Sequence, residues 1–132
     1  MNKLNATIVD YLQEDHLLQV RVSLADTAWH VLLIDSASAR RLLDPGREVH
    51  VLFKESAVTL SRDEKVEIGI QNKLSCKVKQ VRRGELLSQV TLQHQSHDLT
   101  AIVPTAVMDD FGVTPGDELT AWIRANELIL ES

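Results

Sequence analysis

Residues 45–60 read Pro-Gly-Arg-Glu-Val-His-Val-Leu-Phe-Lys-Glu-Ser-Ala-Val-Thr-Leu, and residues 115–130 read Pro-Gly-Asp-Glu-Leu-Thr-Ala-Trp-Ile-Arg-Ala-Asn-Glu-Leu-Ile-Leu. Each position lies about 70 residues from its counterpart, and such a fixed offset is the signature of an internal repeat. The same offset matches Asn2-Lys3-Leu4 to Asn72-Lys73-Leu74 without a gap. The sequence therefore predicts a first unit over residues 1–62, a linker over 63–69 and a second unit over 70–132.

The composition limits the classes of function. The chain has 132 residues, of which 44% are hydrophobic, and its net charge is −5. A unit of roughly 65 residues is marginally stable alone, so we expect the units to pack together or to pair between chains. The negative charge argues against direct nucleic-acid binding, which relies on Lys and Arg neutralising phosphates.

The compartment follows from other features of the composition. Cys76 is the single cysteine, so no disulfide can form within the chain and a reducing compartment is favoured. No signal pattern opens the sequence, and no apolar run approaches the ~20 residues that a bilayer crossing requires. We expect a soluble cytoplasmic protein without a membrane partner.

The hydrophobic pattern predicts strands. Leu18, Val20, Val22 and Leu24 alternate with polar residues, which is the period of a half-buried strand. Strands are expected at residues 4–9, 18–24, 29–34, 49–53 and 58–60, and in the second unit at 77–79, 88–92, 99–103 and two final strands after residue 116. Five strands per unit predict an all-β fold, with two tandem Greek-key barrels of the OB type.

A short helix is expected between the third and fourth strands of each unit. In the first unit Asp35 or Ser36 is placed to cap it, and in the second unit Thr105 is placed to do so. Gly112 is expected to end the second helix in the left-handed conformation. Pro45-Gly46 and its repeat predict tight turns into the fourth strands.

The run Leu99-Thr100-Ala101-Ile102-Val103, a short helix and then residues 115–130 resembles the molybdate-binding Mop (TOBE) domain. The duplication is similar to the tandem di-Mop arrangement of molbindins and of the ligand-sensing half of molybdate-responsive transcription regulators. The resemblance implies a bound molybdate or tungstate, and assembly into a homodimer or homotrimer with sites between subunits.

The family's anion site combines a Ser-Ala-Arg-Asn before the first strand, a hydroxyl pair at the helix start and a Lys-x-Ser/Thr after the fourth strand. The matching oxyanion-binding candidates in the first unit are Lys54, Ser56, Ser36 and Ser38, and Met1-Asn2 stands where Arg-Asn would be. The candidates in the second unit are Asn72, Arg124 and Asn126.

The residue types suit a tetrahedral dianion, which needs donors on several sides and a little positive charge. Lys54 and Ser56 are two apart on an expected strand, so both would point the same way while Glu55 points away. The alternative is a solvated strand end. Arg124 and Asn126 share a face by the same argument, with a salt bridge to Asp or Glu as the alternative.

Other candidates are weaker. His94-x-x-His97 has the spacing of a metal pair but lacks a third ligand, so we expect a surface loop and no metal site. No nucleophile–base–orienter set can be assembled, and we expect no catalytic residue and no enzyme. The hypothesis is storage, buffering or sensing of the oxyanion. The alternative is a ligand-free TOBE interaction or accessory module of a regulator or ABC transporter system.

Overall fold

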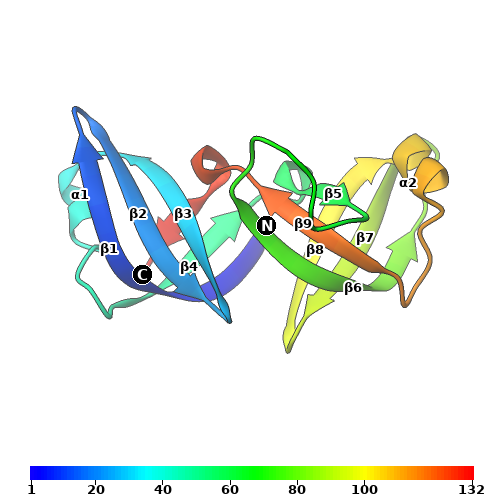
Figure 1. Cartoon of the computed structure of the whole chain (residues 1–132), viewed down its shortest axis with the longest axis horizontal. Coiled ribbons are helices and arrows are strands. Elements are labelled where there is room, and N and C mark those ends of the chain that lie inside the picture. Colours follow the sequence, from blue (N-terminus) through cyan, green and yellow to red (C-terminus); the bar gives the residue numbers. More distant parts are fainter.

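The computed structural model describes all residues from Met1 to Ser132 and consists of two β-barrels side by side, with a short α-helix at each outer end (Figure 1). The first repeat contains β1 (Asn2–Glu14), β2 (Leu17–Leu24), β3 (Thr27–Ile34), α1 (Ala37–Arg40), β4 (Glu48–Phe53), the 3-10 turn η1 (Glu55–Ala57) and β5 (Thr59–Ser61). The second repeat contains β6 (Asn72–Arg82), β7 (Leu87–His94), β8 (His97–Pro104), α2 (Thr105–Phe111), β9 (Glu118–Ile123), the 3-10 turn η2 (Ala125–Glu127) and β10 (Ile129–Glu131).

The two barrels exchange their last strands. The first sheet has the order β10-β4-β1-β2-β3, and the second has the order β5-β9-β6-β7-β8. Leu130 of β10 lies opposite Val51 of β4, and Leu60 of β5 lies opposite Ala121 of β9. The expected fold class of two five-stranded barrels is confirmed, but each barrel is completed by a strand from the other repeat. The predicted division at residues 62 and 70 therefore separates the two sequence repeats, but each sheet contains strands from both repeats.

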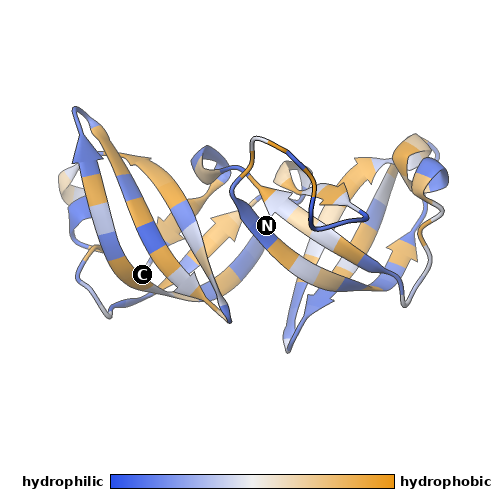
Figure 2. Ribbon diagram, in the orientation of Figure 1, coloured by the Kyte–Doolittle hydropathy of each residue, from blue (hydrophilic) through white to orange (hydrophobic).

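The alternating pattern of β2 places its apolar residues inside. Leu18, Val20 and Val22 are fully buried, while the residues between them are exposed. The same alternation is visible along the strands in Figure 2. The buried hydrophobic residues of both barrels form one continuous cluster, so the barrels share a core. Trp29 lies in it, with its ring centroid 5.9 Å from that of Phe53.

The Pro-Gly turns dock on a bulge in the first strand of each repeat. The register of β1 shifts between Ile8 and Asp10, and that of β6 shifts between Val78 and Gln80. At the first bulge the amide of Gly46 donates to the carbonyl of Ile8 at 2.8 Å. Gly46 has a φ of +88°, which a residue with a Cβ rarely adopts. The predicted tight turn is confirmed.

Three local predictions need correction. Thr105 does not cap α2, because Pro104 holds the cap position and Thr105 is the first helical residue. Its buried hydroxyl instead lies 2.8 Å from that of Ser88. The first strand of the second repeat is longer than the predicted 77–79, because residues on both sides continue the pairing with β9 and β7. His94 and His97 do not lie in a loop, because they face each other at the ends of β7 and β8.

Candidate functional site

Lys54 and Ser56 lie where β4 leaves its sheet. The predicted strand geometry is wrong here, because Lys54 is the cap of η1 and Ser56 lies inside this 3-10 turn. Both side chains are exposed, and neither makes a hydrogen bond or an ion pair within the chain. The turn η1 packs against β8 of the second barrel. Lys54 therefore lies at the junction between the barrels, where the chain passes from β4 to the exchanged strand β5 (Figure 1).

Arg124 and Asn126 occupy the equivalent place in the second repeat. Arg124 is the cap of η2, Asn126 lies within it, and the turn packs against β3 of the first barrel. Both side chains are exposed. The expected alternative of a salt bridge from Arg124 is wrong, because no carboxylate lies within 4.0 Å of its guanidinium group. Two cations without carboxylate partners therefore stand at related positions between the barrels.

Near each cation, an asparagine side chain joins the two barrels by hydrogen bonds. Asn72 is fully buried, and its side-chain amide accepts from the N–H of His30 at 2.7 Å and donates to the His30 carbonyl at 2.8 Å. Asn2 does the same with Thr100, at 2.8 Å for both bonds. These backbone groups belong to the edge strands β3 and β8, whose free polar groups would otherwise be buried without partners.

Five of the predicted residues fall into two groups, called half-sites here: Lys54 with Ser56, and Asn72 with Arg124 and Asn126. In the first, Asn2 lies opposite Phe53 in the sheet, next to Lys54 and Ser56. In the second, Asn72 lies opposite Ile123, next to Arg124 and Asn126. Sequence reasoning omitted Asn2, His30 and Thr100 from the candidates, although the repeat that matches Asn2 to Asn72 was sufficient to identify the first of them.

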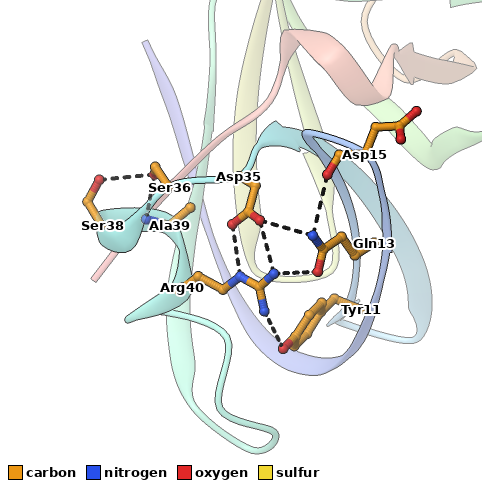
Figure 3. A network of polar contacts seen from close by, with 8 residues as sticks. All are labelled: Tyr11, Gln13, Asp15, Asp35, Ser36, Ser38, Ala39 and Arg40. Atoms are coloured by element: carbon orange, nitrogen blue, oxygen red, sulfur yellow. Dashed lines mark hydrogen bonds and ion pairs between the residues drawn. The ribbon is translucent and has the colours of Figure 1, made fainter.

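Ser36 and Ser38 lie elsewhere, at the outer end of the first barrel (Figures 1 and 3). Ser36 caps α1, because its hydroxyl accepts from the amide of Ala39 at 3.0 Å. The hydroxyls of Ser36 and Ser38 are 3.2 Å apart, and both side chains are exposed. Within one chain the structure does not bring this pair to Lys54, so a site that combined them would need a second copy.

Arg40, the last residue of this helix, is the centre of a polar network (Figure 3). Its guanidinium donates to Asp35 at 2.8 and 3.0 Å, to the hydroxyl of Tyr11 at 3.0 Å and to the amide oxygen of Gln13 at 2.5 Å. The hydrogen bond from Arg40 lowers the pKa of Asp35, and Asp35 in turn raises the pKa of Arg40. All three guanidinium nitrogens of Arg40 donate to these groups. The network therefore holds α1 on the β1–β2 hairpin and does not leave Arg40 free to bind an anion.

The carboxylate next to Lys54 in the sequence, that of Glu55, already has an ion-pair partner. The neighbouring carboxylate of Glu55 is occupied by the N-terminal ammonium at 2.5 Å, and this contact lowers the pKa of Glu55. Each half-site supplies one cation and one neutral donor, a hydroxyl at Ser56 or an amide at Asn126. Since a tetrahedral dianion takes donors from several sides, one half-site alone supplies an incomplete shell.

The side chains of His94 and Cys76 are enclosed by other parts of the chain. His94 is largely buried, and its ring nitrogens lie 2.6 Å from the carbonyl of Ser75 and 3.3 Å from the carboxylate of Asp26. Cys76 is buried, which raises the pKa of its thiol to about 12. Cys76 therefore packs as a small residue of the core. No cluster of three potential metal ligands occurs, and neither α-helix has the length or apolar run of a membrane span.

Comparison with known proteins gives the following findings. The sequence profile of the TOBE domain matches residues 69–130. The chain is 29% identical over 114 residues to the molybdenum transport protein ModE of Azotobacter vinelandii, covering 85% of this chain and 42% of that protein. It is 30% identical over 132 residues to the DNA-binding transcriptional dual regulator ModE of Escherichia coli K12, covering 98% of this chain and 50% of that protein. The chain therefore spans about half the length of these curated relatives.

Among solved structures, the cytoplasmic molybdate-binding protein ModG, crystallised with molybdate bound, superposes with a TM-score of 0.90 at 26% identity. The match covers 98% of this chain and 94% of ModG. The fold thus defines a duplicated β-barrel protein in which the turns that follow Lys54 and Arg124 each pack against the other barrel. The TOBE match over residues 69–130 and the superposition on ModG confirm the predicted resemblance of the chain to tandem Mop/TOBE domains.

Proposed function

We propose that this chain binds molybdate or tungstate in the cytoplasm, as a storage, buffering or sensing protein without catalytic activity. The observation that carries the proposal is the unpaired state of Lys54 and Arg124 at equivalent points of a fold that superposes on ModG over 98% of the chain. Unpaired cations beside neutral donors are suited to a small dianion, since charge-assisted hydrogen bonds are the stronger ones.

The complete site in this proposal forms between copies of the chain, in a homodimer or homotrimer. One half-site contributes Lys54 and Ser56 or Arg124 and Asn126, and the neighbouring copy supplies the remaining donors. Ser36 and Ser38 belong to the proposed donor set only through such a neighbour, because α1 lies at the far end of its own barrel (Figure 1). Asn72 supports the site by holding β3, with its amide engaged by His30.

Calorimetry of the chain with molybdate, tungstate and sulfate tests the proposal. We expect binding of the two larger oxyanions and a loss of affinity on the order of 10- to 100-fold in Lys54→Ala, because a hydrogen bond to a charged group contributes about 1.5–3 kcal/mol. Lys65→Ala is the matched control, since Lys65 is an exposed linker lysine without a side-chain partner. Absence of heat with all three anions would remove the proposal and leave the accessory-module alternative, which the comparisons do not favour.

A further inference from the structure

An exposed apolar surface covers the outer side of β1, β2 and β3 near the end of the β1–β2 hairpin. The strand register aligns its side chains in two rows, Leu12 with Gln19 and Leu32, and Glu14 with Leu17 and Ile34. We call these six residues the first face, and a pocket of about 340 Å³ lies over most of it. Leu12 and Ile34 are 72% and 73% exposed. Adjoining exposed apolar residues of this kind mark an interaction surface, whereas single ones do not.

The second repeat has an equivalent surface on β6, β7 and β8, near the other end of the molecule (Figure 1). Its rows are Arg82 with Gln89 and Ile102, and Leu87 with Pro104, and we call these residues the second face. The 70-residue repeat matches each of them to a residue of the first face. A pocket of about 360 Å³ lies over this face, and Leu86 beside it is 82% exposed.

The two faces carry opposite charge. Glu14 is the only charged residue that lines the first pocket, whereas Arg82 and Arg83 line the second. Neither Glu14 nor Arg82 forms an ion pair within the chain, while Arg83 is paired with Asp109. Each face therefore has one free charge, which is negative on the first face and positive on the second.

The positions of these charges favour contact between unlike faces. When two such faces meet with their strands antiparallel, the first row of one lies against the second row of the other. A first face against a second face then places Arg82 against Glu14, and Ile34 against Ile102. Two first faces would place each Glu14 against Leu12, so that both carboxylates would lose water without gaining a partner. Two second faces would leave both copies of Arg82 without a carboxylate.

We propose that the first face of one copy of the chain binds the second face of another copy. The contact is heterologous, and a closed ring of copies satisfies every face because each copy has one of each kind. About six side chains from each copy are fewer than the ~20–30 residues a side of a standard interface, so a single contact of this kind is weak. Lys54 and Arg124 lie on neither face, so the proposal goes beyond oxyanion binding.

Sedimentation equilibrium in a buffer without oxyanions, at protein concentrations up to about 1 mM, tests the contact. We expect the unmodified chain to associate, and Glu14→Arg and Arg82→Glu each to weaken association about five- to tenfold. Each substitution replaces an attraction between exposed charges by a repulsion of similar size. Glu67→Arg and Lys77→Glu are the matched controls, because they change the net charge equally at exposed positions outside both faces. We expect both controls to associate as the unmodified chain does.

Two combinations supply the decisive comparison, the double variant Glu14→Arg/Arg82→Glu and an equimolar mixture of the two single variants. Both place opposite charges across the contact again, so we expect both to associate within about twofold of the unmodified chain. The proposal is overturned if the unmodified chain is monomeric at about 1 mM. It is also overturned if the single variants associate as tightly as the controls, or if either combination fails to restore association. Calorimetry tests molybdate binding separately, so the two proposals can fail independently.

Discussion

Replacing Asn72 by alanine tests whether the buried asparagines hold the two barrels together. The side chain is fully buried, and its two hydrogen bonds to the N–H and carbonyl of His30 are 2.7 and 2.8 Å long. Asn72→Ala removes both bonds and leaves two backbone groups of the edge strand without partners. We therefore expect lower stability even though no apolar contact is removed.

The magnitude follows from the number of groups left unpaired. An unsatisfied buried donor or acceptor costs about 1–3 kcal/mol, and the partly buried setting of His30 allows some access to water, so we expect a total loss of about 2–4 kcal/mol. For a urea dependence of about 2 kcal/mol/M, the unfolding midpoint should fall by about 1–2 M. Asn2→Ala should behave similarly, because Asn2 makes the same pair of bonds to Thr100.

Urea unfolding followed by tryptophan fluorescence measures this loss, since Trp29 lies in the shared core and donates to the carbonyl of Lys73. Asn5→Ala is the matched control, because Asn5 lies on β1 with an exposed side chain that makes no hydrogen bond. We expect that control to change stability by less than about 0.5 kcal/mol. A loss in Asn72→Ala no larger than that of the control would refute the reasoning.

Four further predictions concern individual residues. Ala25 has a φ of +54°, so Ala25→Gly should raise the free energy of unfolding by up to about 1 kcal/mol in urea melts, and a decrease would contradict the strain argument. A Cβ added at Gly84 would clash with the carbonyl oxygen of Leu87, so Gly84→Ala should cost about 2 kcal/mol or more, and an unchanged melting temperature would be inconsistent with this. The buried thiol of Cys76, with its pKa raised to about 12, should remain unmodified by a thiol reagent at pH 8 until the chain unfolds, whereas rapid modification of the native protein would disprove the burial. The pKa of Asp117 is lowered from 3.8 by the amide of Thr114 and by Arg62, so its stabilising effect is present above about pH 4 and lost as the pH falls through the lower native value. Asp117→Asn should therefore reduce the acid-induced fall in melting temperature, and an unaltered pH profile would argue against this assignment.

The sequence was sufficient to predict the duplicated barrels but not the exchange of their last strands. The repeat and the period-2 alternation determine which residues of each strand are buried. They do not determine which barrel receives a strand, because β5 and β10 are both short and each buries one central leucine, Leu60 or Leu130. The hydrophobic pattern of either strand fits the edge of either sheet. Which sheet a strand joins therefore depends on the path of η1 and η2 across the junction.

The structure corrects the geometry expected of the candidate residues, and their role in oxyanion binding stays a prediction. Lys54 and Arg124 lie at equivalent positions, as an alignment of the repeats suggests, but the lack of an ion-pair partner for Arg124 was not predictable from it. The period-2 argument that placed Lys54 and Ser56 on one strand face is wrong because the chain leaves the sheet after Phe53 and turns. The roles of His30 and Thr100 were not predictable, because they contribute backbone groups whose partners depend on how the barrels pack.

The most direct test of the account is an anomalous difference map at the tungsten edge, from crystals of the protein grown with tungstate. We predict peaks at the junction between the barrels, within about 4 Å of the Lys54 ammonium or the Arg124 guanidinium, with donors from a second copy completing each shell. Peaks confined to the exposed surface away from both cations, or no peak at all, would contradict it.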